Sequence, residues 1–253
     1  MMKTCKILFT LLLVLVSSLG FSQSVPSYVP TSGLVGWWGF NGNAQDGSGN
    51  GNHGTVNGAT LTTDRFENQN SAYDFDGVDD FINVSDNPTL PLFNTDFTFS
   101  SWILPNSTWS NHILYKGQSA GNNFPKYIFT LNQNYSSFHI NGPGLGTGIW
   151  AFSNTMLLNN LEFLTLYLSN SQIHFYKNAQ LVGSYSWSHN VPMTFGHHLR
   201  IGGSEPNGGG WWNGKLDDIG IWNRALTQQE ITNLYNAQLA YSLYRTILLN
   251  CFI

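Results

Sequence analysis

The sequence has 253 residues, of which 9% are charged, 15% are aromatic and 26 are glycine. Few charges and many aromatic residues exclude an intrinsically disordered chain, whose composition is the reverse. The formal net charge is −4 at pH 7 and the sequence has no basic run. Nucleic acid and anionic membranes are therefore not expected partners.

The N-terminal segment has the three-part layout of a secretory signal peptide. Two lysines begin it, an apolar run covers residues 7–16, and Gly20-Phe21-Ser22 precede a predicted cleavage before Gln23. The apolar run is too short to span a bilayer comfortably. We therefore predict a signal peptide over residues 1–22, a secreted protein that acts outside the cell or at the cell surface, and no membrane span in the mature chain.

Beyond a short extended lead-in over residues 23–32, the pattern is one strand after another. Apolar and aromatic runs of about four to eight residues recur, with Gly, Asn, Asp and Ser between them. This spacing predicts a two-sheet sandwich or a barrel rather than alternating βα units. The predicted strands cover residues 34–40, 72–75, 81–84, 97–102, 127–131, 135–140, 163–168, 173–176, 181–185, 199–202 and 216–222.

A single helix is predicted after the last strand. Thr227 and Glu230 have the spacing of a capping box, in which each side chain bonds to the backbone N–H of the other residue. Ile231, Leu234 and Tyr235 then form one apolar stripe, and the helix is expected to end near residue 237. Residues 239–253 form an apolar tail with a single charge, for which the sequence suggests no function.

Four segments in order carry a family resemblance: residues 33–44, 46–54, 73–82 and 213–227. Their residues and spacing resemble the LamG-like jelly-roll domains of secreted bacterial proteins, which are relatives of concanavalin A-like lectins. The resemblance covers roughly residues 33–238. It implies an all-β, two-sheet antiparallel jelly-roll sandwich with one short C-terminal helix, in which the first and last strands are neighbours. One departure is Asn178-Ala179 in place of Asn-Gly, which predicts a looser hairpin turn.

The loop that begins at Asp46 could hold a cation. Asp46, Ser48, Asn50 and Asn52 offer side-chain oxygens at every second residue, with glycines between them. Alternating oxygens let a loop curl around Ca²⁺, which takes 6 to 8 oxygen ligands. The opening resembles that of a calcium loop, but Asn57 stands where a bidentate Glu is expected. One negative charge predicts weak binding.

The pair Asp217-Asp218 could add charge to this loop, because the resemblance brings the last strand beside the first. Alternation along a strand predicts that the two carboxylates face opposite ways, so one is partly buried and needs a partner. That partner could be Ca²⁺, Arg224 or backbone amides, and both the metal and the purely structural interpretation stay open. A structural Ca²⁺ is thus expected at Asp46, Ser48, Asn50, Asn52, Asp217 and Asp218. A second acidic cluster, Asp76, Asp79 and Asp80, is interpreted as a turn that caps its own backbone.

Tryptophans supply the remaining clue to function, because indole rings can stack on the C–H faces of sugars. Trp109, Trp187 and Trp211 lie in turn-like segments and are the predicted ligand contacts. Five others are interpreted as lying in strands and are predicted to be core: Trp37, Trp38, Trp102, Trp212 and Trp222.

Catalysis is not predicted. Glycosidases generally need two carboxylates at a fixed separation, and none of the glutamates has an acidic residue two positions away: Glu67, Glu162, Glu205 and Glu230. The sequence therefore predicts a secreted, non-catalytic carbohydrate- or matrix-binding or adhesion module whose partner is a glycan or an extracellular protein. A structural spacer without a small ligand is the alternative, and a polysaccharide-cleaving hydrolase or lyase is a third reading.

Overall fold

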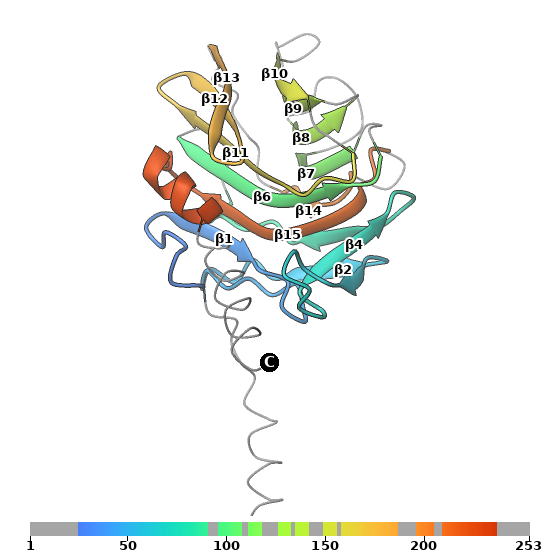
Figure 1. The fold of residues 1–253 in the computed structure, drawn as a ribbon. Coiled ribbons are helices and arrows are strands. Elements are labelled where there is room, and N and C mark those ends of the chain that lie inside the picture. The colour runs from blue at the N-terminus through green and yellow to red at the C-terminus, as the bar shows by residue number, and fades with distance from the viewer. Residues whose placement is uncertain are drawn as a thin grey trace, which may run out of the picture.

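Two antiparallel β-sheets pack face to face in the computed structural model (Figure 1). The structure describes residues 25–90, 96–107, 111–117, 126–132, 135–141, 149–155, 158–186, 196–204 and 209–236. The predicted all-β jelly-roll sandwich with one short C-terminal helix is confirmed. The predicted signal peptide and the apolar tail lie outside the described residues. None of the helical residues described belongs to a segment long and apolar enough to cross a membrane.

The first sheet has eight strands, seven of which follow one another across it. In that order they are β13 (Gln180–Ser186), β12 (Gln172–Lys177), β11 (Glu162–Ser169), β6 (Phe97–Pro105), β15 (Asn213–Trp222), β4 (Ala72–Asp76) and β3 (Thr60–Thr62). The eighth strand, β1 (Leu34–Trp38), pairs with β15.

The second sheet has seven strands. Their order is β10 (Ile149–Thr155), β9 (Tyr135–Asn141), β8 (Lys126–Asn132), β7 (Asn111–Gly117), β14 (Leu199–Ile201), β5 (Phe81–Val84) and β2 (Gly54–Asn57).

The first and last strands of the sandwich lie side by side, as the resemblance implied. Trp37 is paired with Gly220 and Trp38 with Ile219. Strand β15 also pairs with β6 on one side and, through its first four residues, with β4 on the other. The last strand therefore sits in the middle of the eight-stranded sheet.

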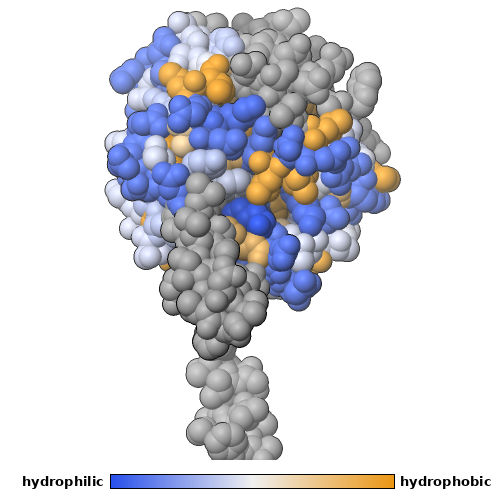
Figure 2. Space-filling view, viewed as in Figure 1, coloured by the Kyte–Doolittle hydropathy of each residue, from blue (hydrophilic) through white to orange (hydrophobic). Residues whose placement is uncertain are grey.

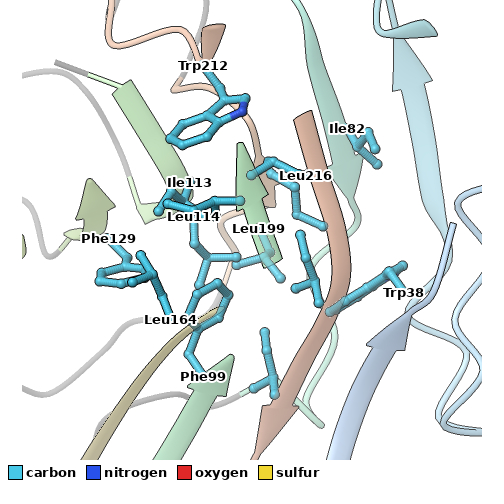
Figure 3. Packing of buried hydrophobic residues seen from close by; sticks show 14 of the residues in the cluster. Trp38, Ile82, Phe99, Ile113, Leu114, Phe129, Leu164, Leu199, Trp212 and Leu216 are labelled. Atoms are coloured by element: carbon cyan, nitrogen blue, oxygen red, sulfur yellow. The ribbon is translucent and has the colours of Figure 1, made fainter. Parts of the chain in front are cut away.

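The main core fills the space between the two sheets. Figure 3 shows how Trp38 and Leu216 from the eight-stranded sheet, and Trp212 from the loop before β15, pack with Ile82, Leu114 and Leu199 from the seven-stranded sheet. Trp38 and Trp212 are completely buried. Burying side chains of this size stabilises the fold by about 1.5–3 kcal/mol each, so the facing sheets are held mainly by this cluster.

A second apolar cluster lies on the outer face of the eight-stranded sheet. Because side chains alternate along a strand, Trp37 and Trp222 face away from the main core and join this cluster. A helical segment over residues 228–236 covers them with Ile231 and Leu234. This cluster explains why the strands of this sheet are apolar on both faces.

The predicted capping box is present at the start of the helix. The N–H of Glu230 donates to Oγ1 of Thr227 over 3.2 Å, and the N–H of Thr227 donates to Oε2 of Glu230 over 2.8 Å. Arg224 also forms an ion pair with Glu230 and, with these bonds, lowers the pKa of Glu230 to about 2. The cap and the ion pair together fix the direction in which the helix leaves β15.

The expected looser turn between β12 and β13 is wrong. Lys177 pairs directly with Gln180, so Asn178 and Ala179 form a two-residue loop, and both have positive φ (51° and 61°). Ala179 is nearly buried in the outer cluster, and the backbone N–H of Phe163 donates to Oδ1 of Asn178 over 2.9 Å. Packing and this hydrogen bond therefore impose a backbone conformation that alanine disfavours.

Candidate functional site

The turn between β4 and β5 and the loop between β14 and β15 meet at one end of the sandwich. Nδ2 of Asn213 donates to the carbonyl oxygen of Asp76 over 3.2 Å. The indole of Trp211 lies so close to Gly203 that a Cβ added there would come within 2.5 Å of the ring and 3.3 Å of the carbonyl oxygen of Asp80. Glycine at position 203 therefore leaves room for the close approach of the indole, because any side chain there would clash with the ring.

Three half-buried side chains, Trp211, Phe81 and Arg200, stack at this end, and we call them the Trp211 site. The rings of Phe81 and Trp211 are 6.0 Å apart and inclined by 33°. The guanidinium of Arg200 lies 5.0 Å from the centre of the Phe81 ring, on the other strand of the pair formed by β5 and β14. Two neighbouring aromatic rings and a cation thus form one half-exposed cluster.

Hydrogen bonds in the loop before β15 hold the Trp211 site in place. Nη1 of Arg200 donates to the carbonyl oxygen of Ser204 over 2.6 Å, and Oγ of Ser204 donates to the carbonyl oxygen of Gly209 over 2.6 Å. The N–H of Trp212 donates to the carbonyl oxygen of Gly202 over 2.8 Å. Trp212 is buried in the core whereas Trp211 remains half-exposed, so the core anchors the neighbouring indole that faces outward.

The acidic cluster of Asp76, Asp79 and Asp80 lies beside the Trp211 site. One carboxylate oxygen from each residue lies within 4.8 Å of the others. Asp80 is nearly buried, and burial together with the neighbouring carboxylates raises its pKa. Part of the predicted capping is present, because the N–H of Asp76 donates to Oδ2 of Asp80 and the N–H of Val78 donates to Oδ1 of Asp76. Among the described residues, these three aspartates form the group that could hold a metal ion.

The loop predicted to bind calcium uses its oxygens within the protein instead. Oδ1 of Asp46 accepts from the N–H groups of Trp37 (3.0 Å) and Ser48 (2.8 Å). Oδ2 accepts from Oγ of Ser48 (2.8 Å) and the N–H of Asn52 (2.9 Å). A carboxylate has about four lone-pair positions, and here each is matched by a donor. This arrangement suits a carboxylate that organises the loop better than one that binds a cation.

The same loop covers the free edge of β1. The carbonyl oxygen of Val35 accepts from the side-chain amides of Asn50 and Asn52, over 3.0 and 2.9 Å. Strand β1 pairs with β15 on its other side only. The loop therefore satisfies edge groups that would otherwise be open to another strand.

The prediction that Asp217 and Asp218 face opposite ways is wrong. Both carboxylates bind the guanidinium of Arg65: Nη1 contacts Oδ2 of Asp217, and Nη2 lies 2.7 Å from Oδ2 of Asp218. The register of β15 against β6 shifts between Asp217 and Gly220, and Asp218 has a φ of 46°. This β-bulge inserts an extra residue, which places both side chains on the same face.

Arg65 is the partner of this pair, rather than Arg224, which binds Glu230 instead. The side chains of Arg65 and Asp217 are 5% and 9% exposed. Burial, and then the charge of Asp218, raise the pKa of Asp217, while Arg65 opposes this change. The two aspartates are thus already paired, and calcium coordination by them stays an untested prediction.

Of the three tryptophans predicted to contact a ligand, only Trp211 belongs to the described residues. Trp109 and Trp187 lie outside them. Sequence reasoning missed Phe81 and Arg200, which join Trp211 only through the pairing of β5 with β14. The signal that could have found Phe81 is its position at the end of the aspartate turn that begins with Asp76.

A family model described as the concanavalin A-like lectin/glucanases superfamily, of the laminin G type, matches residues 76–232. The match covers more than half of the chain. The protein belongs to this superfamily. The order of strands and the pairing of β1 with β15 agree with this membership.

Solved structures with the same fold include domain 4 of AbnA, an extracellular GH43 arabinanase from Geobacillus stearothermophilus, in complex with arabinotriose. It is 18% identical with a TM-score of 0.58, and the match covers 80% of this chain and 98% of that domain. The binding domain of botulinum neurotoxin serotype D is 16% identical with a TM-score of 0.62, over 82% of this chain and 51% of that one. The serotype DC binding domain in complex with rat synaptotagmin II is 17% identical with a TM-score of 0.62, over 82% and 52%. The chain thus spans about half of the neurotoxin binding domains, and at these identities the likeness concerns the fold.

Proposed function

We propose that this protein is a secreted, non-catalytic binding module that recognises a glycan through the Trp211 site. The observation that carries the proposal is the cluster of Trp211, Phe81 and Arg200, which brings two half-exposed aromatic rings and a cation together at one end of the sandwich. Flat aromatic surfaces with a few fixed polar groups are suited to ligands that have both C–H faces and hydroxyls. The arabinotriose bound by the arabinanase domain supports this choice of ligand class, and the synaptotagmin complex supports an extracellular protein as the alternative partner.

The environment of two described glutamates, Glu162 and Glu230, supports a non-catalytic role. Glu162 is nearly buried and lies 3.4 Å from Nζ of Lys177, and Glu230 is bound by Arg224 and the helix cap. Each of these two carboxylates is therefore paired with a basic side chain of the protein. We expect no reducing sugar to be released when the protein is incubated with plant, bacterial or animal polysaccharides. Release from any of them would revive the enzymatic alternative.

Export is proposed from the N-terminal sequence alone. After expression in a bacterial host with a functional secretion pathway, the mature protein is expected to begin at Gln23. Mass spectrometry of the exported chain checks this. An intact N-terminus in a cytoplasmic fraction would contradict it.

Replacing Trp211 with alanine is expected to weaken glycan binding at least tenfold. The substitution removes the larger of the two stacked rings, and tenfold corresponds to about 1.4 kcal/mol. The measurement is a glycan array, followed by calorimetric titration of the strongest ligand with wild type and variant.

The matched control is Tyr185→Ala, because Tyr185 is a comparably exposed aromatic residue on β13, away from the Trp211 site. It should leave affinity unchanged. Equal affinity of wild type and Trp211→Ala would remove the Trp211 site from the proposal. Silence of the folded wild-type protein on every glycan would favour the spacer alternative.

A structural calcium ion remains part of the proposal, and thermal unfolding tests it. A ligand that binds only the folded state raises stability by about 1.4 kcal/mol at ten times its Kd. We therefore expect millimolar Ca²⁺ to raise the unfolding midpoint by several degrees and EDTA to reverse the change. Asp79→Asn should abolish the rise if the acidic cluster holds the ion, because Asp79 is exposed and its replacement is not expected to disturb the core. An unmoved wild-type midpoint would remove calcium from the proposal.

A further inference from the structure

A cavity of about 120 Å³ lies on the outer face of the eight-stranded sheet, away from the Trp211 site. Its floor is formed by neighbouring residues of β6 and β15, where Trp102 pairs with Asp217 and Leu104 with Lys215. Its walls are the loop that carries Arg65, which follows β3, and Leu161, which precedes β11. On the face shown in Figure 2, apolar residues (orange) lie next to strongly hydrophilic ones (blue) to the right of the grey trace.

Two N–H groups of residues that line the cavity have no hydrogen-bond partner. They are Nε of Arg65, whose other two nitrogens bind Asp217 and Asp218, and Nε1 of Trp102. Both side chains are at least nine-tenths buried, and the guanidinium lies 4.9 Å from the centre of the indole ring. Buried donors in folded proteins are nearly always paired, so two neighbouring exceptions call for an acceptor that the protein does not itself supply.

The four charged side chains that line the cavity balance one another, which favours an uncharged occupant, and Asp218, which does not line it, shares Arg65 with Asp217. Arg65 and Lys215 supply two positive charges to the lining, and Asp64 and Asp217 supply two negative ones. Nζ of Lys215 is held by the carbonyl and hydroxyl oxygens of Thr63 over 3.2–3.3 Å. An anionic ligand would meet the two carboxylates, and a cation would meet the two basic side chains.

The size of the cavity and its apolar residues further limit the kinds of molecule that it can hold. Its volume is well below the roughly 300–1,000 Å³ of pockets for drug-sized ligands, so it suits one ring rather than an oligosaccharide. Leu104 and Leu161 offer apolar surface for C–H groups in the cavity that Arg65 and Trp102 also line. We propose that this cavity, the Trp102 cavity, binds a single neutral sugar ring, with hydroxyl or ring oxygens facing Arg65 and Trp102. The inference depends on the proposed glycan-binding function and adds to it a second site.

The experiment follows the indole N–H signals of the whole mature chain labelled with ¹⁵N in its tryptophans. The signals of Trp102 and Trp211 are assigned from Trp102→Phe and Trp211→Phe. The protein is then titrated with L-arabinose, D-galactose, D-mannose and N-acetyl-D-glucosamine. We expect at least one sugar to move the Trp102 signal downfield in a saturable manner, as a new hydrogen bond requires, and the shift to persist in Trp211→Ala.

Two further variants locate the binding. Leu161→Trp is expected to block the mouth of the cavity and to raise the Kd read from the Trp102 signal at least tenfold. Leu158→Trp is the matched control, because Leu158 is similarly exposed (43% against 40%) but does not line the cavity. It should leave the Kd unchanged, and a dispersed indole spectrum shows that each variant folds.

The outcomes separate this inference from the proposed function. The Trp102 cavity is overturned as a sugar site if none of the sugars shifts the Trp102 signal, even if the Trp211 signal responds. It is also overturned if Leu161→Trp gives the same Kd as wild type. If Trp102 responds and Trp211 does not, the cavity stands and the Trp211 site fails. If neither signal responds, the proposed sugar site in the cavity is overturned, and the Trp211 site is then tested by the glycan array alone.

Discussion

Replacing Arg65 with methionine is expected to lower the free energy of unfolding by about 3–5 kcal/mol, the usual cost of removing one partner from a buried ion pair. Arg65 is the shared partner of Asp217 and Asp218, and all three side chains are less than one-tenth exposed. Methionine keeps much of the volume of the side chain but none of its charge. The two carboxylates would remain buried together without a cation.

The loss is expected to depend on pH. Burial raises the pKa of both aspartates, and Arg65 opposes the rise. Without the guanidinium the folded-state pKa values rise further, so the folded variant binds more protons than the unfolded chain. A raised folded-state pKa stabilises the fold at low pH, and this stabilisation disappears as the pH rises through that pKa. The cost of Arg65→Met should therefore be larger near about pH 7.5 than near about pH 5 in urea denaturation.

Two further variants give the comparison its controls. Arg224→Met removes a more exposed arginine that also pairs with a carboxylate, and it should cost only about 1 kcal/mol. Adding Asp217→Asn and Asp218→Asn to Arg65→Met should recover stability near pH 7.5 and flatten the dependence on pH. An Arg65→Met variant as stable as wild type at both pH values would show that the ion pair does not hold β15 in place.

Asp46→Ala is expected to be comparably damaging, with a loss of about 3–5 kcal/mol. The carboxylate accepts four hydrogen bonds, including those from the N–H groups of Trp37 and Asn52. Each buried donor left without a partner costs about 1–3 kcal/mol, and alanine would leave at least two. Urea denaturation of the variant, with and without EDTA, is the measurement.

Asn43→Ala serves as the control in the same stretch of chain. Its exposed side chain accepts one hydrogen bond, from the N–H of Gln45 over 2.9 Å, so its loss should cost less than about 1 kcal/mol. If the loop owes its order to internal hydrogen bonds, EDTA leaves the stability of wild type near that in buffer. If EDTA instead reproduced the loss seen in Asp46→Ala, the original calcium interpretation of the loop would return.

The sequence was sufficient for features that depend on local periodicity. Trp37 and Trp38 are adjacent in a strand, and the prediction that both are core residues is confirmed. They lie on opposite faces of the sheet because side chains alternate along a strand. The capping box of Thr227 and Glu230 was equally readable, because its two partners are three residues apart. The resemblance added the pairing of β1 with β15, which periodicity alone does not specify.

Features that depend on tertiary contacts were not predictable in the same way. Arg65 and Asp217 are 152 residues apart, and nothing near Arg65 marks it as the partner of a buried pair. The bulge at Asp218 adds one residue to β15 and so interrupts the alternation that the prediction assumed. It was not predictable, because one extra residue in a strand leaves no periodic pattern in the sequence. The loop from Asp46 has calcium-like spacing for a related reason: alternate oxygens that can surround an ion can also bond alternate groups along a strand edge.

The central position of β15 has a consequence for the order in which the protein is made. Strands β1, β4 and β6 all pair with β15, yet a ribosome completes β15 only after synthesising those three. Until then, the hydrogen-bonding groups that these three strands will later offer to β15 remain open, and the sandwich cannot close. Closure of the eight-stranded sheet is therefore expected to follow the synthesis of β15.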